Sequence, residues 1–350
     1  MKKNLFFIVA AFLFWSCNNA SSTSTTDNGE AKHGNFTVAF YNVENLYDIT
    51  DDPEISDEEF TPNGENEWTK ERYEKKLADL AKVLSSIDKE NLPGLIGLCE
   101  VENKAVVEAL IQQNDLKAGN YQIIHENSPD GRGIDVALIY RSEFFVYETH
   151  KSIPLTFTEN NEMKVRDILH VTGKTVNGEV LHVFVNHWKS RSGGQAETES
   201  YRLQTAQILY DVVAEIQKNT PEAKIIIMGD LNDEPADKSV AQVLKAGSNC
   251  ETTQNAGLFN LMYNLDSKGE GTHSFRNEWN MLDNLIVSCN LVDATNGLSV
   301  KYDAGSIFKE DWILYKNEEN GSVSPNRTYG GKNYYGGYSD HLPVFAKFTF

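Results

Sequence analysis

Five apolar segments of strand length lie next to side chains that bind metal ions or transfer protons. Segments 36–41, 95–99, 181–185 and 224–228 are each followed by such residues, and a fifth group precedes the last apolar segment. The polar residues are Asn42 and Glu44, Glu100, Asn186 and His187, Asp230 and Asn232, and Asp340 and His341. Buried strands that present carboxylates, amides and imidazoles at their ends build one active site from distant parts of a sequence. The pattern therefore predicts an enzyme.

The pair Asp230 and Asn232 follows the apolar run 225–228 and a glycine. Residues two apart on a strand point the same way, so a carboxylate and an amide would face one cleft together, where they are suited to holding a water molecule next to a metal-bound phosphate. Taken alone, an Asp-x-Asn pair is more typical of a turn. His187, taken alone, is likewise more typical of a structural histidine. The chemical interpretation depends on the groups occurring together.

The elements that must position these residues are short strands alternating with amphipathic helices. Strands are expected over 36–41, 95–99, 135–141, 144–148, 181–187, 224–228, 285–288 and 344–350. Thr69 is the predicted N-cap of a helix whose apolar residues recur from Tyr73 to Leu84, and a second amphipathic helix is expected after Thr198. Helices placed to cover mixed strands predict a layered α/β sandwich.

The composition indicates a globular protein with few general contacts to nucleic acid. The chain has 350 residues, 40% of them hydrophobic, which supports a sizeable core. Its formal net charge of −19 excludes a protein that coats nucleic acid through overall electrostatics. A polyanionic substrate must therefore be met by a local basic patch or by bound cations.

The N-terminus has the pattern of an export signal. Two lysines precede an almost wholly apolar stretch, residues 5–15, which is too short to span a bilayer as a helix. Cys17 follows Ser16 and resembles the lipidated cysteine of bacterial lipoproteins; the alternative is a secretory signal cleaved elsewhere. We expect a signal peptide over 1–17, a flexible tether over 18–34 and one catalytic domain over 35–350. The predicted location is the bacterial cell envelope, with the protein membrane-anchored as a lipoprotein or, alternatively, secreted.

Three cysteines and one acidic segment have open interpretations. Cys99 is predicted to be a small core residue, while Cys250 and Cys289 either pair as a disulfide or stay as buried thiols. Residues 48–67 contain many acids and no basic residue, and they lack the spacing of a calcium loop, so a solvated loop is expected.

Seven short motifs, read in order, resemble those of the endonuclease/exonuclease/phosphatase superfamily, a group of metal-dependent phosphoesterases. They are residues 41–46 (YNVENL), 98–102 (LCEVE), 131–135 (GRGID), 186–187 (NH), 229–232 (GDLN), 282–284 (LDN) and 339–343 (SDHLP). The resemblance covers the chain from about residue 35 to residue 350. It implies a four-layer α/β/β/α sandwich of two mixed β-sheets covered by helices.

The resemblance also implies a role for each motif residue. The metal ligands would be Glu100, Asn42 and Asp340, and the ion would be Mg²⁺, with Mn²⁺ or Ca²⁺ as alternatives. Asp230 and Asn232 would position the attacking water, while Asp283 would orient the imidazole of His341. His187 would serve the leaving group. Asn284 stands where the family more often has an aromatic residue.

Cations and tyrosines near these motifs are candidates for substrate contacts. Arg132, Lys189 and Arg191 are predicted to bind substrate phosphate, and Arg202 to add to the same basic patch, with solvated surface charge as the alternative for Arg191. The tyrosines within 329–338 would either stack on bases or sugars at the rim or pack against the domain edge.

The motifs predict the bond class better than the substrate. The leading hypothesis is a monomeric Mg²⁺-dependent phosphodiesterase that acts on nucleic acid, an endonuclease by analogy, because His187 and His341 resemble the pair found in diesterases. The alternatives are a phospholipid or inositol-phosphate phosphoesterase and a binding module without turnover. A likeness of fold does not choose between them.

Overall fold

Two mixed β-sheets pack face to face in the computed structural model, which describes Met1 and residues 34–250 and 257–350. The predicted signal peptide and most of the tether, with Cys17, lie outside the described residues. The first seven-stranded sheet runs in the order β14, β20, β1, β2, β4, β3, with β15 paired to β20. Its strands are β14 (Ser299–Val300), β20 (Val344–Thr349), β1 (Asn35–Leu46), β2 (Leu95–Val101), β4 (Asp135–Tyr140), β3 (Gln122–His125) and β15 (Ser306–Ile307).

The second seven-stranded sheet runs in the order β5, β6, β7, β8, β13, β10, β9. These strands are β5 (Phe145–Ile153), β6 (Ile168–Thr175), β7 (Val180–His187), β8 (Lys224–Asp230), β13 (Asp283–Ser288), β10 (Leu258–Asn260) and β9 (Ala246–Gly247). In each sheet parallel and antiparallel pairs occur together, for example β7 parallel to β8 and β13 antiparallel to β8. Both sheets are therefore mixed.

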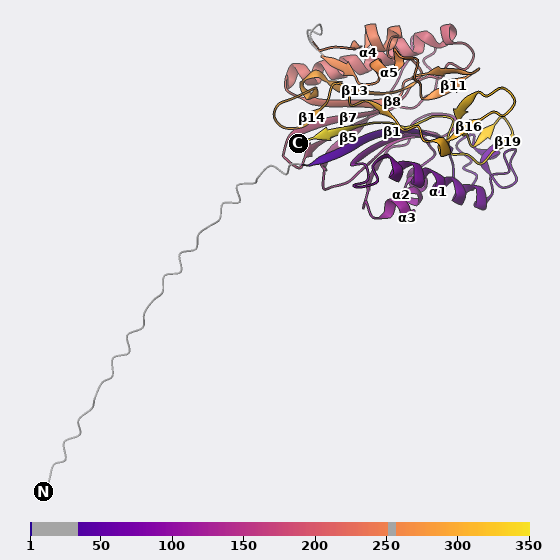
Figure 1. Cartoon of the computed structure of the whole chain (residues 1–350), viewed down its shortest axis with the longest axis horizontal. Coiled ribbons are helices and arrows are strands. Elements are labelled where there is room, and N and C mark those ends of the chain that lie inside the picture. The colour runs from indigo at the N-terminus through magenta and orange to yellow at the C-terminus, as the bar shows by residue number, and fades with distance from the viewer. Residues whose placement is uncertain (2–33, 251–256) are drawn as a thin grey trace. The chain divides into compact units, whose positions relative to one another are not determined.

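Helices cover the outer face of each sheet (Figure 1). Helices α1 (Lys70–Ile87), α2 (Lys104–Ile111) and α3 (Asn114–Lys117) pack on the first sheet, and α4 (Gln195–Asn219) packs on the second. Inward-facing residues of the two sheets, such as Phe40 and Met228, form the core between them. The predicted four-layer α/β/β/α sandwich is confirmed. None of the helices among the described residues is both long and apolar enough to cross a membrane.

Three small hairpins and one short helix complete the fold. They are β11 (His273–Phe275) with β12 (Glu278–Asn280), β16 (Leu314–Lys316) with β17 (Val323–Pro325), β18 (Tyr329–Gly330) with β19 (Asn333–Tyr334), and α5 (Tyr263–Asp266). The labels of β11, β16 and β19 lie at one end of the sandwich in Figure 1. The connections between the core strands therefore form loops and hairpins at that end.

Several element boundaries differ from those expected from the sequence. The Thr69 side chain accepts the N–H of Arg72, which confirms the predicted N-cap of α1. Helix α4 begins at Gln195, three residues before Thr198, because residues 195–197 adopt helical geometry without a side-chain cap. The acidic segment 48–67 is also more than a solvated loop, since Phe60 is buried and stacks on Tyr47 at 4.3 Å between ring centroids.

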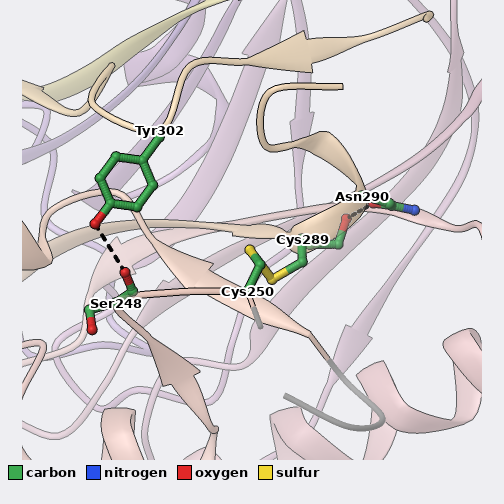
Figure 2. Close-up of a disulfide and its surroundings, with 6 residues drawn as sticks. Ser248, Cys250, Cys289, Asn290 and Tyr302 are labelled. Carbon is green, nitrogen blue, oxygen red and sulfur yellow. Dashed lines mark hydrogen bonds between the residues drawn. A yellow bond between two sulfur atoms is a disulfide. The ribbon is translucent and has the colours of Figure 1, made fainter. Parts of the chain in front are cut away.

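A disulfide joins Cys250 to Cys289, with 5.5 Å between the two Cα atoms (Figure 2). Nearby, the Tyr302 hydroxyl donates to the backbone carbonyl of Ser248 over 3.3 Å. Cys99 is a free thiol buried between the sheets, as expected. The structure thus takes the first of the two interpretations left open for Cys250 and Cys289.

Removing this disulfide is expected to destabilise the domain. The bond closes a loop with a sequence separation of 39 residues. Restricting the unfolded chain over that length contributes about 4 kcal/mol to the free energy of unfolding. The double variant Cys250→Ser/Cys289→Ser should therefore unfold at lower urea concentration, and wild type treated with reductant should match it. If the two unfold as the oxidised wild type does, the disulfide contributes nothing to stability.

A buried histidine pair on the second sheet is expected to make stability depend on pH. The His170 ring stacks on Phe184 with centroids 4.2 Å apart, and its Nε2 lies 3.0 Å from Nδ1 of His182. Burial, with His182 adding to it, lowers the pKa of His170 to about 3. Because the unfolded chain binds this proton near pH 6.5, the free energy of unfolding should fall as pH drops from 6.5 toward 3.

Urea unfolding at pH 7 and pH 5 tests this expectation. The variant His170→Phe keeps a ring against Phe184 and has no titrating group, so it should lose less stability between the two pH values than wild type does. Equal losses in both proteins would rule out His170 as a source of the acid sensitivity.

Candidate active site

Three site residues lie side by side because of the strand register in the second sheet. His187 on β7 is opposite Asp230 on β8, and Asp230 is opposite Asp283 on β13. Residues directly opposite in neighbouring strands project from the same face. His187 closes β7, as expected from the strand predicted over 181–187. Asp230 closes β8 and Asp283 opens β13, so these two strands each extend two residues beyond the predicted 224–228 and 285–288. The register therefore fixes the spacing of these side chains.

The imidazole of His341 lies between two carboxylates. Its Nδ1 is 2.6 Å from Oδ2 of Asp283, and its Nε2 is 3.8 Å from Oδ2 of Asp230. All three side chains are buried. Burial alone would lower the pKa of His341, but the charges of Asp283 and Asp230 outweigh it and raise that pKa well above its usual range. Asp283 therefore holds the His341 ring through Nδ1, which is the contact expected for this pair.

The first sheet contributes Asn42 on β1 and Glu100 on β2. The Asn42 Nδ2 donates to Glu100 Oε1 over 3.2 Å and to Asp230 Oδ2 over 3.1 Å, so this amide links the ends of the two sheets. Its Oδ1 accepts the backbone N–H of Glu44. The amide oxygen thus has a partner already, and the role of Asn42 as a metal ligand stays a prediction.

The backbone is strained at four residues near this junction, one of them Glu44, with a φ of 51°. Glu100 has a φ of 62°, Asn45 has 52°, and Asn232 has 51°. Residues other than glycine rarely adopt this left-handed backbone conformation. They keep it where the surrounding structure holds the backbone in place. Here the Asn45 N–H donates to Glu100 Oε2 over 3.0 Å, and the Asn232 N–H donates to Asp230 Oδ1 over 2.9 Å. The strained turns therefore fix both carboxylates.

The charges at this junction fit a bound cation. Among the described residues, the groups within ion-pair distance of Glu100 and Asp230 are imidazoles, with no lysine or arginine nitrogen within 4.0 Å of either carboxylate. His187 does not neutralise them, because burial and the nearby Arg166 lower its pKa well below the usual range. Burial raises the pKa of Asp230 to about 7, and the charge of His341 opposes that rise without cancelling it. Oxygen ligands with uncompensated negative charge suit a hard divalent cation.

His187 contacts the same two carboxylates. Its Nε2 lies 3.8 Å from Glu100 Oε1 and 3.7 Å from Asp230 Oδ2. Its Nδ1 is buried and makes no hydrogen bond within the described part of the chain. The two imidazoles, His187 and His341, therefore both lie beside Asp230. Asn232 donates its Nδ2 to the Trp188 carbonyl, which holds the turn after β8 against the turn after β7.

Asp340 lies at the edge of the site next to two histidines. Ligand atoms of Asp340, His341 and His273 lie within 4.8 Å of one another. Asp340 Oδ2 also accepts from Nη2 of Arg327 over 3.0 Å. The predicted metal role of Asp340 therefore competes with an ion pair. Glu44, near the end of β1, accepts the backbone N–H groups of Thr328 and Tyr329 and so anchors the segment that leads into β18.

A local excess of positive charge surrounds Asp130 beside His187. Arg166 is buried and pairs with Asp130 over 3.0 Å, while its other terminal nitrogen donates to the Trp188 carbonyl. Arg132 Nε lies 3.7 Å from the same carboxylate. Lys189 has no carboxylate within 4.0 Å of its Nζ among the described residues, and burial lowers its pKa. Two arginines thus share one carboxylate, and Lys189 lies close enough for both of them to lower its pKa, so the predicted phosphate contacts Arg132 and Lys189 lie in one region beside His187.

The other two predicted cations are engaged in pairs. Arg191 Nη2 lies 2.8 Å from Asp237 and 3.5 Å from Asp233, and its Nε donates to the Asn232 carbonyl. These contacts hold the turn after β8 and leave the phosphate role of Arg191 without structural support. The expectation that Arg202 adds to a basic patch is wrong, because Arg202 is buried and pairs with Asp233 over 2.7 Å.

Most of the tyrosines in 329–338 pack against the domain. Tyr329 is buried in an aromatic cluster with Phe60 and Trp68, and Tyr338 packs on Trp312. Tyr334 packs against Tyr329 and also contacts the Arg72 guanidinium, whereas Tyr335 is exposed. The domain-edge alternative therefore holds for three of these four side chains.

Two residues next to the site, His273 and Arg166, were not predicted from the sequence, because neither follows an apolar run of strand length. His273 contacts the His341 ring, with centroids 4.8 Å apart, and Arg166 joins the Asp130 and Trp188 segments. His273 stands in a short hairpin, and Arg166 precedes β6 rather than following a strand. A search for charged residues just before strands would have found Arg166.

Comparison with known proteins identifies the family and the fold. The model of the endonuclease/exonuclease/phosphatase family matches residues 37–349. No curated protein matches the chain. Among solved structures, D. rerio TDP2 complexed with a single strand DNA product has a TM-score of 0.53 and 16% identity, covering 90% of this chain and 99% of that one.

Two further structures have the same fold and different names. Bacteroides thetaiotaomicron mannosyl-6-phosphatase has a TM-score of 0.53 and 16% identity, covering 90% of this chain and 100% of its own. The human Nocturnin catalytic domain with a bound sulfate anion has a TM-score of 0.52 and 16% identity, covering 91% of this chain and 97% of its own. At these identities the likeness shows the fold alone.

Proposed function

The chain belongs to the endonuclease/exonuclease/phosphatase family, whose members hydrolyse phosphoesters, and from this premise we propose a Mg²⁺-dependent phosphodiesterase that cleaves nucleic acid. The observation that carries the proposal is the pair of imidazoles, His187 and His341, whose Nε2 atoms lie 3.7 Å and 3.8 Å from the same oxygen of Asp230. A nucleic-acid diester, like an alkyl monoester, has an alkoxide leaving group, which needs a proton or a nearby hydrogen-bond donor as it departs. Two imidazoles around one water-positioning carboxylate meet that need.

Each residue would contribute a separate part of an in-line attack by water. Asp230 accepts the proton of the attacking water, and Asn232 orients that water beside it. His341, held by Asp283, donates a hydrogen bond to a phosphoryl oxygen, while His187 serves the leaving oxygen. Glu100, with Asn42 and Asp340, would hold Mg²⁺. When bound, such an ion neutralises charge that develops on the phosphate oxygens.

The excess of positive charge around Asp130 supports a polyanionic substrate. Arg132 and Lys189 lie beside His187, where phosphates flanking the scissile bond would run. In a chain with net charge −19, such a local patch is the means by which a nucleic-acid backbone would be held. A small phosphomonoester has no second phosphate, so it would not need cations placed away from the reacting phosphate.

A panel of phosphoesters tests the proposal. Purified protein with Mg²⁺ should hydrolyse plasmid DNA or RNA, and should leave sphingomyelin and inositol phosphates intact. Mn²⁺ and Ca²⁺ should be compared in place of Mg²⁺. Hydrolysis of lipid without plasmid cleavage would replace the nuclease by a phospholipase, and no hydrolysis of any phosphoester by metal-loaded protein would leave a binding module.

We also propose export to the cell envelope with a lipid on Cys17. The disulfide Cys250–Cys289 supports this, since disulfides persist in oxidising compartments. Metabolic labelling with palmitate should mark the wild-type chain and not the variant Cys17→Ala. A labelled variant, or a wild type that stays in the cytoplasm, would contradict the anchor.

A further inference from the structure

We infer that the tip of the β11–β12 hairpin, Phe275 with Arg276, is a platform on which a nucleobase near the scissile phosphate stacks. This inference rests on the proposed action on nucleic acid and adds the residues that hold the strand. The tip of the hairpin carries an exposed aromatic ring with a cation beside it. The other end of the hairpin is attached to the segment that carries His341.

The base of the hairpin is attached to the segment that carries His341. His273 on β11 forms a β-bridge with His341, and the Leu342 N–H donates to the Thr272 carbonyl over 2.8 Å. The Thr272 Oγ1 accepts the backbone N–H of Asp283. Thr272, which leads into the hairpin, is therefore hydrogen-bonded to Asp283 and to Leu342, the residue after His341, so the hairpin tip has a defined position relative to the His341–Asp283 pair.

Strand alternation places Phe275 on the same side of the hairpin as the residue that contacts the site. Side chains two apart on a strand share a face, so Phe275 follows His273 on the face that meets the His341 ring. The two Cα atoms are separated by about 7 Å along the strand, which is about two stacking steps of a nucleic-acid strand at 3.4 Å each. Trp279, on the other face, is covered by Lys309 with 4.1 Å between Nζ and the ring centroid.

The aromatic ring at the tip has a free surface. Phe275 is 59% exposed, although a phenylalanine gains free energy by burial. The Arg276 guanidinium lies 5.0 Å from its ring centroid, which leaves the rest of the ring open. Arg276 and Asn277 both have positive φ, 52° and 69°, so a tight two-residue turn presents the pair. An aromatic face beside a cation suits a base together with its phosphate.

The composition of the tip favours a nucleobase over a membrane. Phe275 is followed by Arg276, Asn277 and Glu278, all of them exposed and polar. A membrane-inserting tip would bury several apolar residues, whereas a single ring flanked by polar groups suits stacking in water. The proposed partner is therefore a single-stranded or locally opened stretch of the nucleic-acid substrate.

Kinetics with two substrates tests the platform. For a single-stranded oligodeoxynucleotide, Phe275→Ala should lower kcat/KM by about tenfold, mainly by raising KM, because it removes one stacked base. Phe275→Trp should restore it. For methyl p-nitrophenyl phosphate, a diester too small to reach the tip, both variants should match wild type. Tyr302→Ala, which truncates an exposed tyrosine near the disulfide, is the matched control and should change neither rate.

An oligonucleotide that lacks one base, an abasic site, tests whether Phe275 acts by stacking on that base. Placed at the stacked position, the abasic site should lower kcat/KM for wild type as much as Phe275→Ala does, and the two changes should not add. Equal losses on both substrates, or unchanged oligonucleotide kinetics in Phe275→Ala, would overturn the platform while leaving the nuclease intact. Loss of phosphatidylcholine vesicle binding in Phe275→Ala without a change in oligonucleotide kinetics would replace it by a lipid contact. A wild type that cleaves the small diester but no oligonucleotide would refute the nuclease and the platform together.

Discussion

The variant His341→Asn is expected to hydrolyse phosphodiesters with a kcat about a hundredfold to ten-thousandfold below wild type, the range that one positioned acid–base group contributes. In the wild type, the Nδ1 of His341 lies 2.6 Å from Asp283 Oδ2, and the Nε2 of His341 lies 3.8 Å from Asp230 Oδ2. Asparagine reproduces the Nδ1 position and leaves nothing at Nε2. The group proposed to contact the phosphoryl oxygen is thereby lost, while the hydrogen bond to Asp283 survives.

Steady-state kinetics and thermal unfolding separate loss of chemistry from loss of fold. His341→Asn should unfold near the wild-type temperature, because the buried Asp283 keeps a partner. His150→Gln on the edge strand β5 is a matched control, since that histidine pairs with Glu126 away from the site. A loss below about tenfold in His341→Asn, or a similar loss in His150→Gln, would contradict the assigned role.

The sequence predicted which residues form the site but not how they meet. The ordered motifs named Asn42, Glu100, His187, Asp230, Asp283 and His341, and the structure brings all six together. The spacing of His187, Asp230 and Asp283 follows from the register of β7, β8 and β13, in which Asp230 pairs with His187, 43 positions earlier, and with Asp283, 53 positions later. Apolar runs predict where strands lie. A strand predicted from its apolar run stops at the first polar residue, so the predicted strand is too short where the real strand ends in a polar residue such as Asp230.

The cations were the least predictable part of the site. A guanidinium beside a motif either faces substrate or pairs with an acid elsewhere in the chain. Arg202 pairs with Asp233 across 31 positions, and that contact exists only once α4 packs on the second sheet. Lys189 and Arg202 look alike in sequence, as single cations near the same motif. Only the tertiary packing shows that the first lacks a carboxylate partner and the second is buried with one.

Substituting Glu100 by glutamine is expected to weaken Mg²⁺ binding at least tenfold and to lower turnover at a fixed Mg²⁺ concentration by more. Glutamine keeps the shape of the side chain and can still accept the Asn45 N–H. What it removes is negative charge at a place where, among the described residues, no lysine or arginine lies within 4.0 Å. Binding of Mn²⁺, followed by electron paramagnetic resonance in the absence of substrate, measures the effect without relying on activity.

Glu102→Gln is the matched control for this prediction. Glu102 lies two residues further along, is buried, and accepts the Asp48 N–H over 2.6 Å, so its loss should affect the loop after β1 rather than the ion. Equal weakening of Mn²⁺ binding in both variants would mean that the general negative charge of this edge, not Glu100, attracts the cation. Unchanged binding in Glu100→Gln would instead place the ion on the Asp340 side. There it would have to displace Arg327 from the carboxylate, and Arg327→Ala would then tighten binding.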